Sequence, residues 1–190
     1  MILNDDTSRT GELPMTDWSR DLITHSGFKF HVRPARPDDV VALGAFFARV
    51  TPEDLRFRFL SSMKTVDQDR LKSMTSVDHR QTESFLAVEP SNGAIVATAM
   101  LACDPALEVG DVAISVSADR KNLGISWELL NHITRYAVAK GVKRLQSLES
   151  RSNGSAIKLE KELGFTAEPY LGDSTLMLLQ KRLDQQTSGS

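Results

Sequence analysis

A strand that leads directly into a long amphipathic helix constrains the fold of this chain more than any other segment. The apolar run from Asp111 to Val116 predicts the strand, and residues 124–140 predict the helix. Free N–H groups and the positive end of the helix dipole make such a helix start an anion site. Arg120 and Lys121 add positive charge there, and Gly124 allows close approach to the backbone. The turn is therefore either a cradle for a phosphorylated cofactor or an ordinary turn with solvated basic residues.

Composition limits the classes of protein to consider. With 190 residues, 41% of them hydrophobic, the chain is long enough for one buried core and predicts a single domain. Lys and Arg number 23 against 25 acidic residues, so the net charge of -2 argues against a general nucleic-acid binder. Any basic patch must be local, and a small anion is the expected partner rather than a polymer.

Metal binding, disulfides, secretion and membrane insertion are not expected. Cys103 is the single cysteine, which excludes an internal disulfide, and no histidine or cysteine cluster has metal-ligand spacing. The first residues lack the basic start and the apolar stretch of a signal peptide. The longest apolar run, Val40 to Ala48, is shorter than the roughly 20 residues of a membrane span. These features predict a cytoplasmic protein without a metal or a membrane partner.

The first half of the chain predicts a tail, a strand, helices and a hairpin. Residues 1–27 are expected to form a polar tail or a loosely docked arm, because they show little periodicity. The expected elements that follow are a strand from Phe28, helices from Pro37, from Thr51 and over 66–74, and strands over 84–89 and 94–103. The last two strands flank an Asn-Gly turn and therefore predict an antiparallel hairpin.

The second half continues with alternating helices and strands. After the strand over 111–116 and the helix over 124–140, the expected elements are a strand over 142–148, a helix that Ser152 and Asn153 can cap, and strands over 166–171 and 175–181. The order is strand, helices, three strands, helix, strand, helix, two strands. The domain is expected to span residues 28–183 and to be followed by a disordered tail over 184–190.

That order, the turn before Gly124 and the segment from Asn153 to Phe165 together resemble the GCN5-related N-acetyltransferase (GNAT) superfamily. The segments from Arg33 to Asp39 and from Thr51 to Phe59 are similar to the bacterial protein lysine acetyltransferase branch. The resemblance implies a single α/β (α+β) domain. Its central sheet would be mixed, largely antiparallel and twisted, with about seven strands and helices on both faces.

The resemblance also implies acetyl-CoA or CoA as cosubstrate, with no metal. The cofactor motif of the family falls on residues 121–126, with departures from the pattern at Lys121 and Ser126. Backbone N–H groups from Asn122 to Trp127 would hold the pyrophosphate, and Asn153 would meet the pantetheine arm unless it only caps its helix. The expected cofactor-binding residues are Ile114, Val116, Lys121, Asn122, Leu123, Gly124, Ile125, Ser126, Trp127 and Asn153.

Acetyl transfer needs a neutral amine, hydrogen-bond donors for the developing oxyanion and a proton for the departing thiolate. By resemblance, Asp111 would be the general base, directly or through a water, with Glu108 as the reserve candidate. The oxyanion donors would be main-chain amides near residues 114–116, where the strand would be bulged and splayed from its neighbour. Many family members carry a tyrosine at the position of Glu160, which we interpret here as an exposed helical glutamate.

Three functions remain open from the sequence. The first is an N-acetyltransferase that transfers the acetyl group directly, with a protein lysine or a small amine as acceptor. The second is a non-catalytic sensor domain that binds CoA or acyl-CoA, and the third is an interaction module without a cofactor. Arg56 and Arg58 are interpreted as a solvated helix face rather than as ligands of an acidic substrate. A homodimer also remains open.

Overall fold

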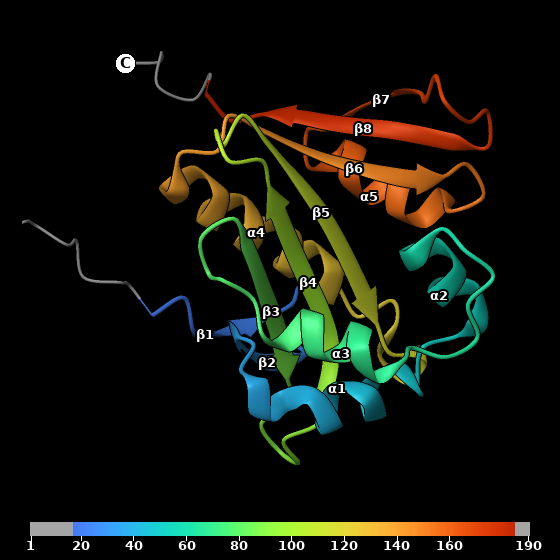
Figure 1. Cartoon of the computed structure of the whole chain (residues 1–190). Coiled ribbons are helices and arrows are strands. Elements are labelled where there is room, and N and C mark those ends of the chain that lie inside the picture. The colour runs from blue at the N-terminus through green and yellow to red at the C-terminus, as the bar shows by residue number, and fades with distance from the viewer. Residues whose placement is uncertain (1–16, 185–190) are drawn as a thin grey trace, which may run out of the picture.

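Eight strands form one sheet in the order β1-β2-β3-β4-β5-β6-β8-β7 in a computed structural model that describes residues 17–184 (Figure 1). The strands are β1 (Arg20–Ile23), β2 (Lys29–Pro34), β3 (Thr82–Val88), β4 (Ile95–Cys103), β5 (Val109–Val116), β6 (Arg144–Ser150), β7 (Thr166–Pro169) and β8 (Leu176–Arg182). All neighbours are antiparallel except β5 and β6, which are parallel. The predicted mixed, largely antiparallel sheet is confirmed, with eight strands in place of about seven.

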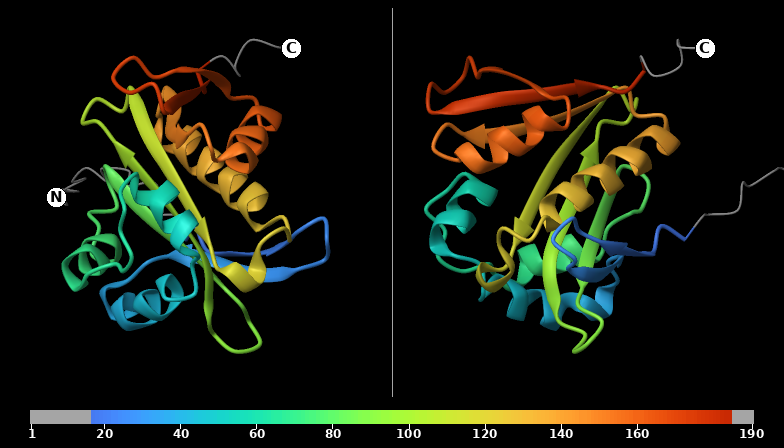
Figure 2. Two further views of the ribbon diagram at one scale, coloured as in Figure 1. Left: turned by 90° about the vertical axis from the view of Figure 1, so that its right-hand side faces the viewer. Right: turned by 180° about the vertical axis from the view of Figure 1, so that it is seen from behind.

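Helices cover both faces of the sheet (Figure 2). They are α1 (Val40–Phe47), α2 (Pro52–Phe59), α3 (Gln68–Thr75), α4 (Ile125–Lys140) and α5 (Gly154–Glu162), with short turns η1 (Pro37–Asp39) and η2 (Ala118–Arg120). One buried cluster lies between the sheet and α4, and a second lies between the sheet and α1 with α3. None of the helices described for residues 17–184 has the length and apolar character of a membrane span.

The sheet gains its additional strand from the segment predicted to be a tail. β1 pairs with β2 from Arg20↔Val32 to Ile23↔Lys29. Trp18, just before it, packs edge-on against Tyr136 at 5.2 Å between ring centroids. The domain therefore begins before Phe28, while residues 1–16 and 185–190 lie outside the part that is described. The strand was missed because it is a short edge strand without alternation: Ile23 is 60% exposed.

Local capping decides the most ambiguous helix. Residues 55–59 alternate like a strand, yet α2 is helical. The Oγ1 of Thr51 accepts a hydrogen bond from the N–H of Asp54 at 3.1 Å, which satisfies one of the free donors at the helix start. The predicted cap is thus confirmed, and α2 is placed beside the later strands rather than in the sheet.

The sheet opens between β5 and β6. These strands pair only from Val109↔Arg144 to Asp111↔Gln146, although both continue beyond that point. Figure 1 shows β6 and β8 diverging from β5, with α2 beside the open end of the gap. The expected splay is therefore present. The expected bulge is not, because β5 keeps a continuous register against β4 from Ala97↔Val116 to Cys103↔Gly110.

Candidate functional site

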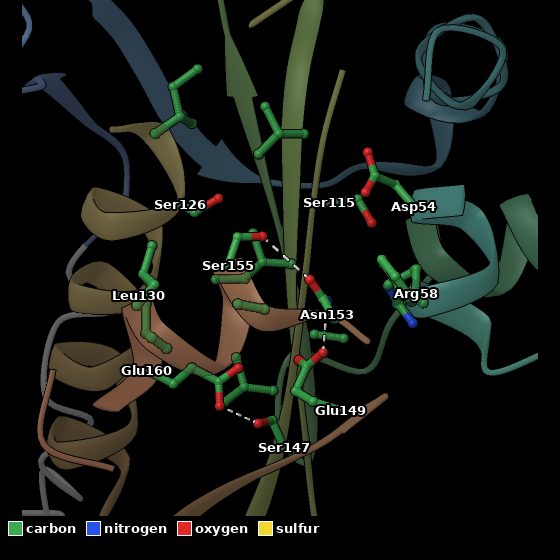
Figure 3. Close-up of a pocket in the computed structure, with 18 of the residues that line it drawn as sticks. Asp54, Arg58, Ser115, Ser126, Leu130, Ser147, Glu149, Asn153, Ser155 and Glu160 are labelled. Carbon is green, nitrogen blue, oxygen red and sulfur yellow. Dashed lines mark hydrogen bonds between the residues drawn. The ribbon is translucent and has the colours of Figure 1, made fainter. Parts of the chain in front are cut away.

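A cavity of about 260 Å³ occupies the gap between β5 and β6. Its walls come from α2 on one side and from the starts of α4 and α5 on the other, as the close-up in Figure 3 shows. The lining residues are Asp54, Phe57, Arg58, residues 112–116, Arg120, Lys121, Asn122, residues 124–126, Leu130, residues 147–149, Asn153, Ser155, Ala156, Leu159, Glu160 and Phe165. Segments distant in the sequence therefore meet at one site.

The main chain of β5 forms a free edge along this cavity. The N–H of Ser117 donates to the carbonyl of Val96 at 2.9 Å, so this residue points toward β4. Since backbone groups in an antiparallel ladder alternate in direction, the N–H and C=O groups of Ile114 and Val116 point away from β4. β6 no longer pairs there. The gap thus exposes unpaired main-chain donors and acceptors to a ligand.

The turn before α4 supplies further N–H groups. Asn122 and Gly124 have positive φ angles of 61° and 89°, which turn the chain sharply into the helix. No side chain caps the first turn of α4, so its N–H groups are not satisfied by a capping residue. Together with the helix dipole, these donors fit an anion.

The basic residues of the turn are already paired with acids. The Nζ of Lys121 lies 2.6 Å from the carboxylate of Asp54 on α2, and Arg120 lies 3.0 Å from Glu89. Both basic side chains still line the cavity. Their charge is therefore partly compensated, in contrast to the expectation of free positive charge beside the turn.

Gly124 serves a packing role that the sequence did not indicate. A Cβ at this position would lie 2.8 Å from the ring of His25, in the turn between β1 and β2. In the same turn, the hydroxyl of Ser26 donates to the carbonyl of Leu123 at 2.7 Å. The open side of Gly124 is thus occupied by protein rather than left free for a ligand, and the β1–β2 turn fixes the cofactor turn.

The structure brings most of the predicted cofactor residues together. Those that line the cavity are Ile114, Val116, Lys121, Asn122, Gly124, Ile125, Ser126 and Asn153. Leu123 and Trp127 do not line it, and Leu123 packs against the core instead. Asn153 stands at the N-cap position of α5, but its side chain makes no capping hydrogen bond. Its Nδ2 donates to Glu149 at 3.0 Å, so Asn153 occupies the predicted cap position while its side chain serves the cavity instead of the helix start.

Two glutamates, Glu160 buried and Glu149 half-buried, lie together at the far end of the cavity. Glu160 is 7% exposed and accepts a hydrogen bond from the hydroxyl of Ser147. Glu149, on β6, accepts the hydrogen bond from Asn153 and interacts with Glu160. Figure 3 shows these side chains converging. The interpretation of Glu160 as an exposed helical residue is therefore wrong.

Burial changes the protonation of this carboxyl pair. Burial and the negative charge of Glu160 raise the pKa of Glu149 to about 8, although the hydrogen bond from Asn153 and the charge of Arg58 oppose this shift. Burial also raises the pKa of Glu160, although the hydrogen bond from Ser147 opposes that shift. Two close carboxyl groups with raised pKa values titrate as a unit and hold a shared proton at higher pH than free carboxyls do. The cavity therefore contains a proton donor and a proton acceptor side by side.

The predicted base lies at the apex of the gap but not in the cavity. Asp111 is exposed, and its carboxylate accepts a hydrogen bond from Gln146 at 2.7 Å, at the last β5–β6 pair. Glu108 is also exposed, in the loop before β5, and does not line the cavity. The position of Asp111 thus allows contact with an acceptor that enters at the apex, whereas Glu108 is remote from the lining.

The described lining of the cavity contains no thiol, no imidazole and no metal ligand cluster. Among the described lining residues there is no cysteine or histidine. Cys103 lies outside the cavity, and burial, with the charges of Asp104 and Asp111, raises the pKa of its thiol. In residues 17–184, no three His, Cys, Asp or Glu side chains gather as metal ligands would. The available chemistry is proton transfer and main-chain hydrogen bonding.

Sequence reasoning missed Glu149, Glu160 and Arg58 as cavity residues. A signal for Glu160 was present, because it follows Ala156 and Ile157 by four and three residues and therefore shares their inner helix face. No local signal marks Glu149, which becomes a partner of Glu160 only when β6 and α5 pack together.

Comparisons with known proteins agree with this geometry. The model of the acetyltransferase (GNAT) family matches residues 48–165. Acetyltransferase PA5475 of Pseudomonas aeruginosa is 26% identical over 149 residues, 77% of this chain and 80% of that protein. The GNAT domain of PAT from S. lividans superposes with a TM-score of 0.82 at 22% identity, covering 88% of this chain and 98% of that chain. The structure of yncA from Salmonella typhimurium with acetyl-CoA has a TM-score of 0.66 at 20% identity, covering 85% and 98%.

Proposed function

Because the chain belongs to the acetyltransferase (GNAT) family, we propose that it transfers the acetyl group of acetyl-CoA directly to a primary amine, either a protein lysine or a small amine. The observation that carries this proposal is the cavity in the splay. It runs from the uncapped start of α4 to the carboxyl pair of Glu149 and Glu160. The single cysteine fits a reducing compartment, and we place the reaction in the cytoplasm.

The residues present fit acetyl-CoA. N–H groups at the start of α4 suit its pyrophosphate, and the free edge of β5 at Ile114 and Val116 suits the amides of its pantetheine arm. The structure of yncA, which holds acetyl-CoA, supports the same assignment for a related fold. When bound, acetyl-CoA supplies an activated thioester. Asn153 lies where it can contact the arm while it orients Glu149.

The carboxyl pair can move both protons that the reaction requires. Transfer forms a C–N bond and breaks a C–S bond, while the amine loses a proton and the departing thiolate gains one. A pair that shares one proton can donate it toward the thiolate and accept the proton of the amine, so its own charge is unchanged at the end. Glu160 thus provides the proton donor that a tyrosine supplies at this position in many members of the family. Main-chain N–H groups of Ile114 and Val116 can stabilise the developing oxyanion.

Asp111→Asn should lower kcat/KM by less than about tenfold, below the ~10²-fold that is typical of losing a buried general base. The carboxylate is exposed beside Gln146, so water can take over its role with an incoming ammonium. Steady-state kinetics at neutral pH on an amine that the wild type accepts would measure the effect. A loss of about 10²-fold or more would make Asp111 the principal base and would limit the carboxyl pair to the thiolate side.

Binding and turnover together test the proposed function. Isothermal calorimetry should detect acetyl-CoA and CoA with similar affinities, because the cavity addresses the pyrophosphate and the arm. Incubation with acetyl-CoA and a panel of lysine peptides and small amines should release free CoA thiol and form an acetylated amine. Binding without turnover of any amine would favour the sensor domain. Absence of binding at millimolar acetyl-CoA would overturn the acetyltransferase assignment for this cavity.

A further inference from the structure

Arg58 is a charged residue of the cavity to which the proposed reaction assigns no role. It lies on α2, and its Nε atom is buried and has no hydrogen-bond partner in the described residues. Within residues 17–184, no acidic side chain lies within ion-pair distance of its guanidinium. The contacts of the guanidinium are the sulfur of Met100, 3.4 Å from Nη2, and the ring of Phe59 at 4.8 Å. A half-buried guanidinium whose Nε has no partner is costly unless a ligand supplies one.

The surroundings of Arg58 favour an anion. Arg70 lies over the same Phe59 ring at 4.9 Å, so two guanidinium groups flank one aromatic side chain. Burial and, to a smaller extent, the positive charge of Arg70 lower the pKa of Arg58 to about 10, whereas the negative charge of Glu149 opposes this shift. Of the acids near these arginines, Asp67 caps α3 through a hydrogen bond from the N–H of Arg70, and Glu149 is held by Asn153. Neither compensates Arg58 with an ion pair.

A second unpartnered group lies on the same side of the cavity. The Oγ of Ser115 is buried without a hydrogen-bond partner among the described residues. Met100, which Arg58 contacts, pairs with Ala113 across the sheet, and Ser115 is the next residue on that face of β5. Figure 3 shows Ser115 and Arg58 on the α2 side of the cavity. The guanidinium of Arg58 and the hydroxyl of Ser115 can therefore both bind a polar group of a ligand in the cavity.

On this basis we propose that the acceptor is a small amine that carries its own carboxylate, and that Arg58 binds this carboxylate. The inference rests on the proposed function and narrows its acceptor. A protein lysine would present an alkyl chain and no negative charge to this wall, and would leave the Arg58 guanidinium without a counter-ion. A small molecule with both groups could place its carboxylate at Arg58 and its amine within the same cavity, because Arg58, Glu149 and Glu160 all line it. Arginine binds carboxylates with two parallel hydrogen bonds.

Matched acceptors test the proposal directly. Glycine, β-alanine, 4-aminobutanoate and the protein amino acids are compared with their carboxamides, which keep size but lose the negative charge. The kcat/KM of the best acid should exceed that of its carboxamide by about 10- to 100-fold, the range of a charged hydrogen bond. Amine basicity works against this result, since carboxamides hold more neutral amine. Binding of the N-acetylated products, measured by calorimetry with CoA present, should show the same preference.

Substitutions on α2 test whether Arg58 causes the preference for carboxylated amines over their carboxamides. Arg58→Met should remove the preference for acids while the affinity for acetyl-CoA stays unchanged. Arg58→Lys should keep part of the preference, because a charge remains without the bidentate geometry. Arg56→Met is the matched control, since Arg56 is exposed on the same helix, and it should behave like the wild type. Thermal unfolding of each variant verifies the fold.

Other outcomes would overturn the proposal in distinguishable ways. Equal or faster transfer to lysine peptides or to carboxamides would refute the carboxylated acceptor and leave the acetyltransferase function intact. Loss of acetyl-CoA affinity in Arg58→Met would assign Arg58 to a phosphate of CoA instead. Binding of acetyl-CoA without transfer to any amine would overturn both the acceptor class and the proposed function.

Discussion

Glu160→Gln is expected to lower kcat by about 10²-fold, within the range for loss of general acid–base catalysis, without destabilising the domain. The amide keeps the shape of the side chain, and its carbonyl can still accept the hydrogen bond from Ser147. It cannot exchange a proton with Glu149, so the shared proton of the pair is lost. The affinity for acetyl-CoA should not change, because Glu160 lies away from the start of α4. Steady-state kinetics and calorimetry measure the two effects separately.

Whereas kcat of Glu160→Gln should fall, its thermal stability relative to the wild type should rise with pH. A carboxyl whose folded pKa is raised above its ordinary 4.5 binds more protons in the folded than in the unfolded chain, so folding stability falls as pH rises from 4.5 to the raised pKa. Glu160→Gln removes this loss, and its Tm should therefore exceed that of the wild type increasingly above pH 4.5. Thermal unfolding of both proteins between pH 5 and 9 measures this difference in Tm.

A control on the same helix separates this effect from a general change of charge. Glu162 is exposed on α5 and pairs with Lys158 at 4.0 Å. Glu162→Gln should keep both kcat and the pH dependence of Tm. Full activity of Glu160→Gln, or a Tm that does not respond to pH relative to the wild type, would remove the carboxyl pair from the mechanism.

Deletion of residues 1–26 is expected to destabilise the domain strongly and to weaken acetyl-CoA binding. The deletion removes β1, the packing of Trp18 against Tyr136, and the hydrogen bond from Ser26 to Leu123 in the cofactor turn. Replacing a fully buried Trp by Ala typically costs about 3–5 kcal/mol, and half-buried Trp18 contributes part of that range in addition to the lost strand pairing. We therefore expect an insoluble or largely unfolded product, which is the reverse of what a tail would produce.

Point variants test the separate contributions of residues in the deleted segment. Trp18→Ala should lower Tm clearly, whereas Ile23→Ala should leave it nearly unchanged, because Ile23 is 60% exposed. Ser26→Ala should raise the Kd for acetyl-CoA with a smaller effect on Tm, since it releases only the turn at Leu123. Chemical denaturation and calorimetry provide the measurements. A soluble, fully stable deletion product that binds acetyl-CoA normally would show that β1 contributes nothing to the site.

Local physical chemistry was sufficient for much of the fold. The cap at Thr51, the Asn-Gly turn at residues 92–93 and the helix stop at Gly141 act over a few residues, so the sequence alone placed α2, the β3–β4 hairpin and the end of α4. The uncapped start of α4 was readable for the same reason, because the direction of N–H groups at a helix start depends only on local backbone geometry. The cavity residues next to this helix start could therefore also be predicted from the sequence.

Tertiary structure alone decided what depends on distant segments. β1 has no pattern of its own and exists because β2 offers an edge, and its turn takes the space beside Gly124 that seemed open to a ligand. The raised pKa values of Glu149 and Glu160 arise from burial where β6 and α5 pack together, with the charge of Glu160 adding to the shift of Glu149, and no spacing in the sequence encodes them. Arg58 is half-buried and lines the cavity only because α2 packs beside the splay. Sequence determines which groups are present and how each element begins and ends, whereas the environment of a charge is set by the packing of elements far apart in the chain.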